Sequence, residues 1–281
     1  MKTFKLTSIS ILAIIFIVVS CKKDDSKDTT KPSTELSTSN QVSITDDQVT
    51  EGIATAMDAA DGTEDGSADL RPVSCATITA NADTKTITID FGTGCVNPVT
   101  HRTRSGKIIV GYTGANYINA TARTIEFVNY KTVDSVTLNG TFTQSNIVRT
   151  DSTSVAFTLS ASNFTFLFAD GKTHTLVTYT RDFAINLGSD HRSIADNTTT
   201  ISGSTTGINK EGEAYSVTIT TPVVISGACA LLPNPTFYPT VGSYDIKIGN
   251  RPKFSLSWGT GDCDKIITVT YLGFSADITL E

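Results

Sequence analysis

Four cysteines, at positions 75, 95, 229 and 263, have the clearest potential for chemistry in this chain. An even number of thiols can form disulfides in an oxidising compartment, and four cysteines allow three pairings. A zinc site is the alternative, but zinc ligands usually include a CxxC pair, which these cysteines do not form. We therefore expect two disulfides, and we expect no bound metal or other cofactor.

The three histidines, His101, His174 and His191, follow no spacing typical of catalysis or metal binding. His174 lies between two threonines, which predicts a histidine on the surface of a strand, with a catalytic base as the alternative. His101 is followed by Arg102 and Arg104, and we interpret this basic patch as a charged loop, with an anionic sugar or a lipid headgroup as its alternative ligand. An acid/base pair of the glycosidase kind stays open among the 28 acidic residues, but no spacing singles one out, so we assign no catalytic residue.

The N-terminus carries a different chemistry. Two lysines precede an apolar run of 14 residues from Leu6 to Val19, and Cys21 follows. This arrangement is typical of a secretory signal, because a helix that spans a bilayer needs about 20 apolar residues. The segment Val18-Val19-Ser20-Cys21 resembles the lipobox of bacterial lipoproteins. The resemblance implies a signal peptide over residues 1–20 and acylation of Cys21, with palmitate as a label for the modification, so that lipid anchors the mature chain to a membrane.

The residues after the expected anchor predict where the chain is sent. Lys22, Lys23, Asp24 and Asp25 resemble the lysine-plus-acids signal that directs some lipoproteins to the outer face of the outer membrane. A solvated charged tether is the alternative. The following segment is rich in Ser, Thr, Lys, Asp and Pro, so we expect a lipid-anchored flexible linker over residues 21–44. These features predict an outer-membrane lipoprotein at the cell surface.

The remaining residues, 45–281, are expected to form a β-rich domain. Thr45 and Gln48 fit a capping box, and helical spacing from Val49 to Ala60 predicts one short N-terminal helix over about 46–60. Beyond the helix, apolar and polar residues alternate in runs separated by turn signals, which is typical of antiparallel strands. We expect an all-β fold, an antiparallel meander of roughly 12 to 14 strands that forms an open barrel or a two-layer sandwich.

An internal echo suggests how the cysteines pair. Residues 89–95 read IDFGTGC and residues 256–263 read LSWGTGDC, and a lone cysteine precedes each segment. Glycines let the chain bend at the end of a sheet, so each segment is expected to be a strand end. We therefore predict the local disulfides Cys75–Cys95 and Cys229–Cys263, with bridges between the two halves as the alternative.

These two segments, together with the RTRSGKI sequence over residues 102–108, resemble a group of bacterial lipoproteins of unknown function in which FGxGC strand ends recur. The second segment departs from that pattern by the additional Asp262. The resemblance implies secretion, lipidation and an all-β fold, and it implies no activity.

The net charge of the chain argues against one class of partner. The formal charge of −6, from 22 basic and 28 acidic residues, becomes −8 when residues 1–20 with their two lysines are removed. This balance argues against nucleic acid as a partner. We expect a binding or structural lipoprotein that presents a Thr/Ser-rich face to a glycan or an envelope protein. The alternatives are a polysaccharide-acting hydrolase with unrecognised carboxylates and a periplasmic acyl-chain carrier, which would need a continuous apolar cavity.

Overall fold

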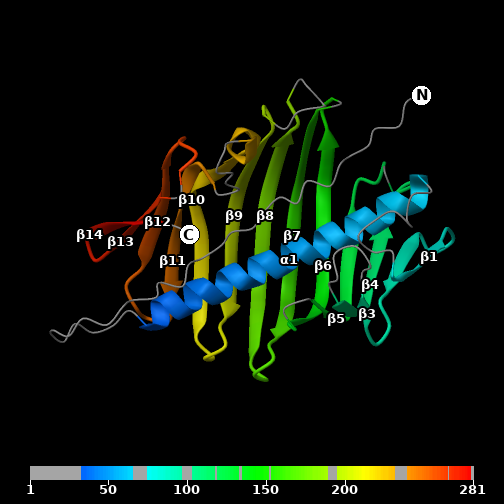
Figure 1. Ribbon diagram of the computed structural model, residues 1–281, viewed down its shortest axis with the longest axis horizontal. Helices are drawn as coiled ribbons and strands as arrows, with labels where there is room; N and C mark the ends of the chain where they lie inside the picture. Colours follow the sequence, from blue (N-terminus) through cyan, green and yellow to red (C-terminus); the bar gives the residue numbers. More distant parts are fainter. Residues whose placement is uncertain are drawn as a thin grey trace.

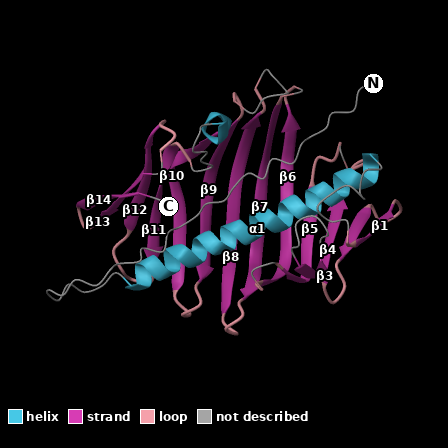
Figure 2. Cartoon of the chain, in the orientation of Figure 1, coloured by secondary structure: helices cyan, strands magenta, loops and turns pink. Residues whose placement is uncertain are grey.

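A computed structural model of the chain describes residues 33–65, 75–96, 103–117, 119–132, 135–151, 153–188, 195–231, 239–264 and 266–279. In this part of the chain one long helix, α1 (Ser33–Asp65), crosses one face of a single large antiparallel sheet (Figures 1 and 2). The prediction of an antiparallel β meander with one N-terminal helix is confirmed.

The described strands follow one another in the sheet almost in chain order, β1-β2-β4 and then β5 to β14, and β3 pairs with β4 outside this path. The path does not close, so β1 and β14 are its two edges. The strands are β1 (Thr77–Asn81), β2 (Thr86–Asp90), β3 (Cys95–Val96), β4 (Thr103–Tyr112), β5 (Arg123–Lys131), β6 (Thr137–Arg149), β7 (Ser154–Leu167), β8 (Thr173–Asn186), β9 (Thr198–Ile208), β10 (Ala214–Ser226), β11 (Val241–Ile248), β12 (Phe254–Thr260), β13 (Ile266–Tyr271) and β14 (Phe274–Thr279).

The core lies between α1 and the sheet because the strands alternate between a buried and an exposed face. In β5, for example, Ile125 and Phe127 are buried while Thr124 and Glu126 are exposed. One apolar cluster joins α1 to β2 and β4–β8, and a second extends over β9–β13. Small residues let α1 approach closely: a Cβ on Gly52 would lie 2.6 Å from the ring of Phe127.

The helix is longer than the sequence predicted. It begins at Ser33, so residues 33–44, which were expected to belong to the flexible linker, are helical. The predicted capping box is wrong, because Thr45 lies inside the helix and its hydroxyl donates a hydrogen bond to the carbonyl of Val42 (2.8 Å). Apolar periodicity misses this half of the helix because its buried face is polar. The buried polar residues of α1 are Thr38, Gln41, Thr45, Gln48 and Thr55.

The polar half of α1 is bound to one end of the sheet. The amide of Asn209 donates to Thr38 Oγ1 (2.9 Å), and the amide of Gln41 donates to Glu211 (2.7 Å). Both strand-side partners belong to the turn over residues 209–213. Turns alternate between the two ends of an antiparallel meander, so the turns at 168–172, 249–253 and 272–273 lie at this same end. We call it the proximal end of the sheet and the opposite end the distal end.

Candidate functional site

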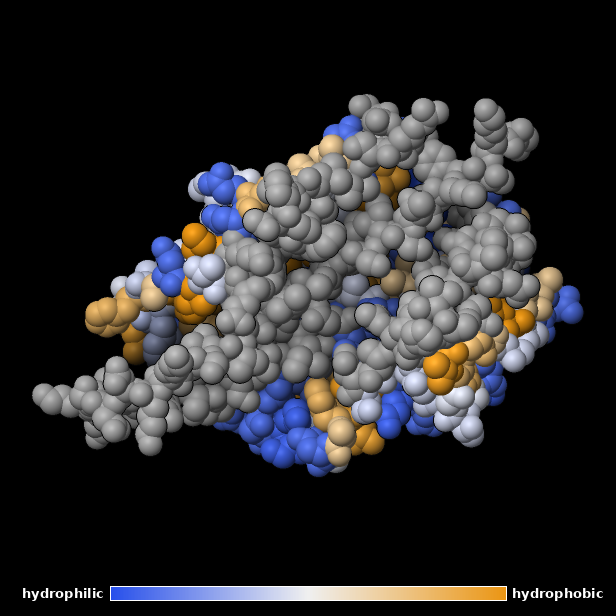
Figure 3. Space-filling view, in the orientation of Figure 1, coloured by the Kyte–Doolittle hydropathy of each residue, from blue (hydrophilic) through white to orange (hydrophobic). Residues whose placement is uncertain are grey.

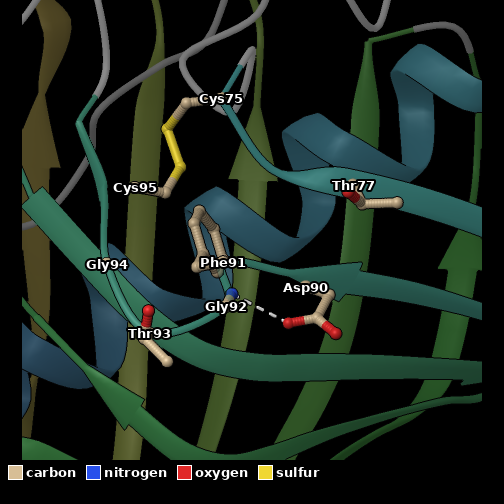
Figure 4. A pocket seen from close by; sticks show the side chains of 8 residues that line it. All are labelled: Cys75, Thr77, Asp90, Phe91, Gly92, Thr93, Gly94 and Cys95. Atoms are coloured by element: carbon tan, nitrogen blue, oxygen red, sulfur yellow. Dashed lines mark hydrogen bonds between the residues drawn. A yellow bond between two sulfur atoms is a disulfide. The ribbon is translucent and has the colours of Figure 1, made fainter.

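A shallow hollow lies beside the first of the two repeated segments, near the β1 edge of the sheet. It has a volume of about 410 Å³ and is lined by Cys75, Thr77 and residues 90–95 (Figure 4). One oxygen of Asp90 accepts a hydrogen bond from the backbone N–H of Gly92 (2.8 Å), and the other lies 2.8 Å from Nζ of Lys107. Lys107 first, and then Gly92, lower the pKa of Asp90. The hollow therefore presents the hydroxyls of Thr77 and Thr93 next to a carboxylate that is already paired.

The two repeated segments, residues 89–95 and 256–263, have similar local structures at their aromatic and glycine positions. Their aromatic residues, Phe91 and Trp258, are each 3 % exposed, and the glycines that follow, Gly92 and Gly259, both have positive φ angles of 60° and 84°. The next cysteine of each segment closes a local disulfide. The bridges are Cys75–Cys95, with Cα atoms 5.6 Å apart, and Cys229–Cys263, with Cα atoms 5.3 Å apart. Both predicted pairings are confirmed, and the alternative of bridges between the two halves is wrong.

A buried ion pair, which we call the helix latch, connects α1 to the sheet. Arg104 of β4 donates from Nε (2.8 Å) and from a terminal nitrogen to the carboxylate of Glu51 of α1. The hydroxyl of Tyr130, from β5, donates to the second oxygen of Glu51 (3.0 Å) and accepts from Arg104 (3.1 Å). Burial disfavours the charge of Arg104, but Glu51 and Tyr130 beside it raise its pKa. Arg104, which the sequence placed in a basic loop, is thus a buried residue that holds the helix.

The other residues of the RTRSGKI segment also serve the architecture. Gly106, with φ at 82°, lies at a bulge between β4 and β5, where a Cβ would come within 2.1 Å of the carbonyl oxygen of Asn129. Lys107 forms the ion pair with Asp90 across β2 and β4, and Ile108 is fully buried in the core. These contacts give Arg104, Gly106, Lys107 and Ile108 structural roles in the described part of the segment.

Breaking the helix latch is expected to destabilise the fold. Arg104→Met leaves the Glu51 carboxylate with the Tyr130 hydroxyl but without its charged partner, and removing one partner of a buried ion pair costs about 3 to 5 kcal/mol. Lys107→Met, the control, breaks a pair whose lysine side chain is 50 % exposed, and is expected to cost less than about 1 kcal/mol. Urea denaturation of both variants measures the two free energies. The double variant Glu51→Leu/Arg104→Met should recover most of the lost stability. Equal destabilisation by Arg104→Met and Lys107→Met would contradict the role of the helix latch.

A second buried group, which we call the central polar cluster, lies between α1 and the middle strands. It comprises Asp46 of α1, His174, Tyr179 and Arg181 of β8, and Tyr215 of β10. Nε2 of His174 lies 2.7 Å from the hydroxyl of Tyr215, and the guanidinium carbon of Arg181 lies 5.0 Å from the centre of the Tyr179 ring. The prediction that His174 is a strand-surface residue is wrong, because its side chain is 0 % exposed. The two-residue period turns the flanking threonines outward and His174 toward the core.

Burial shifts two groups of the central polar cluster in opposite directions. It lowers the pKa of His174 to about 4, with a smaller contribution from Lys210. It raises the pKa of Asp46 to about 6, although the charge of Arg181 opposes the shift. Between pH 4 and pH 6 the cluster therefore contains a neutral imidazole and a carboxyl group that takes up a proton. A glycosidase needs two carboxyl groups, and the described cluster has one.

These two pKa shifts predict that the free energy of unfolding depends on pH differently in the parent and in Asp46→Asn. Between pH 6.5 and about 4 the unfolded chain protonates His174 and the folded chain does not, so acidification destabilises the fold by about 3 kcal/mol. Asp46 has the opposite effect, because the folded chain takes up its proton at about pH 6 and the unfolded chain at 3.8. Its contribution is also about 3 kcal/mol, and the asparagine variant lacks it.

Urea denaturation at pH 7 and pH 4 should therefore show Asp46→Asn losing about 2 kcal/mol more than the parent over this interval, because the unfolded carboxyl is already partly protonated at pH 4. The exposed Ser162→Ala, which changes no titratable group, serves as the control and should follow the parent. Parallel curves for the parent and Asp46→Asn would show that Asp46 does not titrate in this window.

Several residues singled out in the sequence lie outside the described part of the chain. They are Cys21, Lys22, Lys23, Asp24, Asp25, His101, Arg102 and His191. Sequence reasoning also missed the partners that matter most, Glu51, Asp46 and Arg181. A signal for Arg181 existed, since it is in phase with the inward-facing Tyr179 and Phe183 of β8.

The described residues hold no group of three or more His, Cys, Asp or Glu side chains that could bind a metal ion. Within the same residues no helix is long and apolar enough to span a membrane. No protein-family model, no curated protein and no solved structure matches the chain.

Proposed function

We propose that this chain is an outer-membrane lipoprotein, anchored through Cys21 and exposed at the cell surface, whose sheet binds a glycan or an envelope protein or serves as a structural element. The lipobox-like segment and the lysine-plus-acids segment support the anchor and the export. The sheet supports a binding role, because one of its faces is committed to α1 while the other carries an ordered array of hydroxyl groups.

That hydroxyl array is the observation that carries the binding proposal. Exposed side chains on neighbouring strands pair with each other at distances of 2.7 to 2.8 Å, so their positions are set before any ligand arrives. The pairs are Thr158–Asp182, Thr178–Thr206, Thr220–Ser243, Thr268–Asp277 and Thr270–Ser275. Sugars and backbone amides both exchange hydrogen bonds with hydroxyls, which can donate and accept.

The two alternative functions receive less support. An acyl-chain carrier needs room between the helix and the sheet, whereas Val49, Ala56 and Ala59 of α1 pack into the strand core with 2 % exposure or less. A hydrolase needs reactive groups within reach of a substrate, whereas the carboxylate of Asp46 on α1 is shielded by burial, with Arg181 of β8 as its charged neighbour. Residues that the sequence singled out for possible chemistry instead serve the architecture: the four cysteines form disulfides, and Arg104 belongs to the helix latch.

Binding can be tested with the mature chain on glycan arrays and on immobilised envelope proteins. The double variant Thr178→Val/Thr206→Val removes a hydroxyl pair from the middle of the exposed face and is expected to weaken binding about tenfold. Thr84→Val/Thr86→Val is a matched control, because these two hydroxyls also form a 2.7 Å pair but lie beside the β1–β2 turn. Equal affinities of the two variants would move the binding site elsewhere, and failure to bind any probe would count against a binding role.

Surface export has its own test. Replacing Lys23, Asp24 and Asp25 with Ala should reduce cleavage of the chain by a protease added to intact cells, while palmitate labelling stays at the parental level. Unchanged cleavage would contradict the export signal and leave the anchor intact.

A further inference from the structure

Exposed apolar side chains are concentrated at the proximal end of the sheet. Of the eight large apolar residues that are exposed in the described part of the chain, six lie in the proximal half of the sheet, five of them at its turns and strand ends, and two lie at the distal end. The six are Val96, Leu167, Val177, Ile208, Leu272 and Phe274. Figure 3 shows apolar side chains at the margin of the molecule over β13 and β14. Single exposed apolar residues are common, but their concentration at one end of a sheet indicates an interaction.

The last hairpin presents the most exposed of these side chains. Phe274 is 81 % exposed and Leu272 is 63 % exposed, and both lie at the tight turn between β13 and β14. Leu272 and Gly273 have positive φ angles of 52° and 84°, a pair typical of a type I′ turn. Asn, Asp or Gly is preferred at the first of these positions. A leucine there is unfavourable for two reasons: its backbone adopts a positive φ angle, and its apolar side chain is exposed to water. Tyr271 lies opposite Phe274 and completes an apolar tip.

The proximal end is also the end from which the chain leads back to the expected anchor. Thr38 and Gln41 bind the first turns of α1 to the 209–213 turn. Cys21 is 12 residues before Ser33 along the chain. A chain of that length spans at most about 40 Å, whatever its conformation. A lipid on Cys21 would therefore hold the proximal end close to the membrane surface.

Charges at this end are paired with one another. Lys210 lies 2.6 Å from Asp170, and Lys172 lies 3.9 Å from Glu211. Two further pairs, Arg251–Glu213 and Lys253–Asp245, flank the 249–253 turn. The four basic and four acidic side chains of these pairs neutralise one another, so the pairs themselves add no net charge that would attract anionic lipid.

We infer that the proximal end is a membrane-contacting surface, and that Leu272 and Phe274 insert among the lipid headgroups of the bilayer that carries the anchor. This inference rests on the proposed lipid anchor, which brings the tip within reach of the bilayer. The tip combines Tyr271, which has an apolar ring and a polar hydroxyl, with the apolar Leu272 and Phe274. Segments that anchor proteins at the membrane interface have this amphipathic character. The contact would point the distal end of the sheet away from the membrane and leave the hydroxyl face free.

The test places a fluorescent reporter at each end of the same hairpin. Phe274→Trp and Ile266→Trp are prepared in the full-length lipidated chain, reconstituted in phosphatidylcholine vesicles, and read as difference spectra against the parent with its buried Trp258. Ile266 is the matched control, because it is 42 % exposed and begins β13 at the distal end. Brominated phosphatidylcholine quenches a tryptophan that contacts it, so it should reduce the Phe274→Trp emission about twofold and leave the Ile266→Trp emission unchanged. Adding phosphatidylglycerol or salt should not change this result.

The possible results separate the inference from the anchor. If palmitate labelling shows acylation but the two reporters are quenched equally or not at all, the membrane contact is wrong and the lipoprotein proposal stands. A blue shift of Phe274→Trp that occurs without vesicles and grows with protein concentration would assign the tip to a second copy of the chain and overturn the membrane contact. Absence of acylation would contradict the proposed anchor, and with it the contact.

Discussion

Replacing Cys21 with Ala is expected to move the chain from the membrane fraction to the soluble fraction and to abolish incorporation of labelled palmitate. A single acyl chain gives only marginal membrane binding, while several chains add about 0.8 kcal/mol for each buried CH₂. Loss of all of them should lower membrane partitioning by at least about 1,000-fold. The apolar proximal tip does not compensate, because two inserted side chains supply far less burial than acyl chains. Cell fractionation and palmitate labelling measure the two effects separately.

The matched control is Ser26→Ala, which changes a nearby residue of similar size and leaves the lipobox-like segment intact. It should fractionate and incorporate palmitate as the parent does. A Cys21→Ala chain that stays with membranes and still carries labelled palmitate would show that another residue is acylated. A variant that stays with membranes without palmitate would instead assign attachment to the protein surface, and the proximal end would be the first region to examine.

Much of the sheet was predictable because strand periodicity is a local signal. Alternation over the run from Phe164 to Ala169 places Phe164 and Phe166 in the core, where both are 0 % exposed. The same period places His174 in the core beside Leu176, whereas the polar threonines on either side of it suggest a surface position. In a sheet with a Thr-rich outer face, threonine neighbours instead mark the residue between them as inward-facing.

The helix was harder to predict because its contacts are with partners distant in the chain. Thr38 and Gln41 are polar residues in a polar segment, and composition indicates a linker. They are buried because Asn209 and Glu211 lie more than 160 residues later in the sequence and meet them at the proximal end. The helix latch has the same character. Glu51 and Arg104 carry no local sign of their pairing, and the fold brings them together.

Removing both disulfides is expected to be the most destabilising change in the described part of the chain. Cys75–Cys95 spans 20 residues and Cys229–Cys263 spans 34, so the chain-entropy model assigns them about 3 and about 4 kcal/mol. Their sum approaches the whole stability of a typical domain, which is about 5 to 15 kcal/mol. Alanine pairs at both bridges should therefore leave a chain that is partly unfolded at physiological temperature, as urea denaturation and circular dichroism would measure.

The single-bridge variants test whether the two edges of the sheet are independent. Cys75–Cys95 ties the segment before β1 to β3, and β1 is mostly exposed, so its loss should first release the β1 edge. Cys229–Cys263 instead ties the distal ends of β10 and β12 together on the other side of the sheet. Sites this far apart without shared partners usually have additive effects within about 0.5 kcal/mol. A double variant that loses much more than the sum would show that the edges unfold cooperatively, and peptide mapping that links Cys75 to Cys263 would contradict the pairing itself.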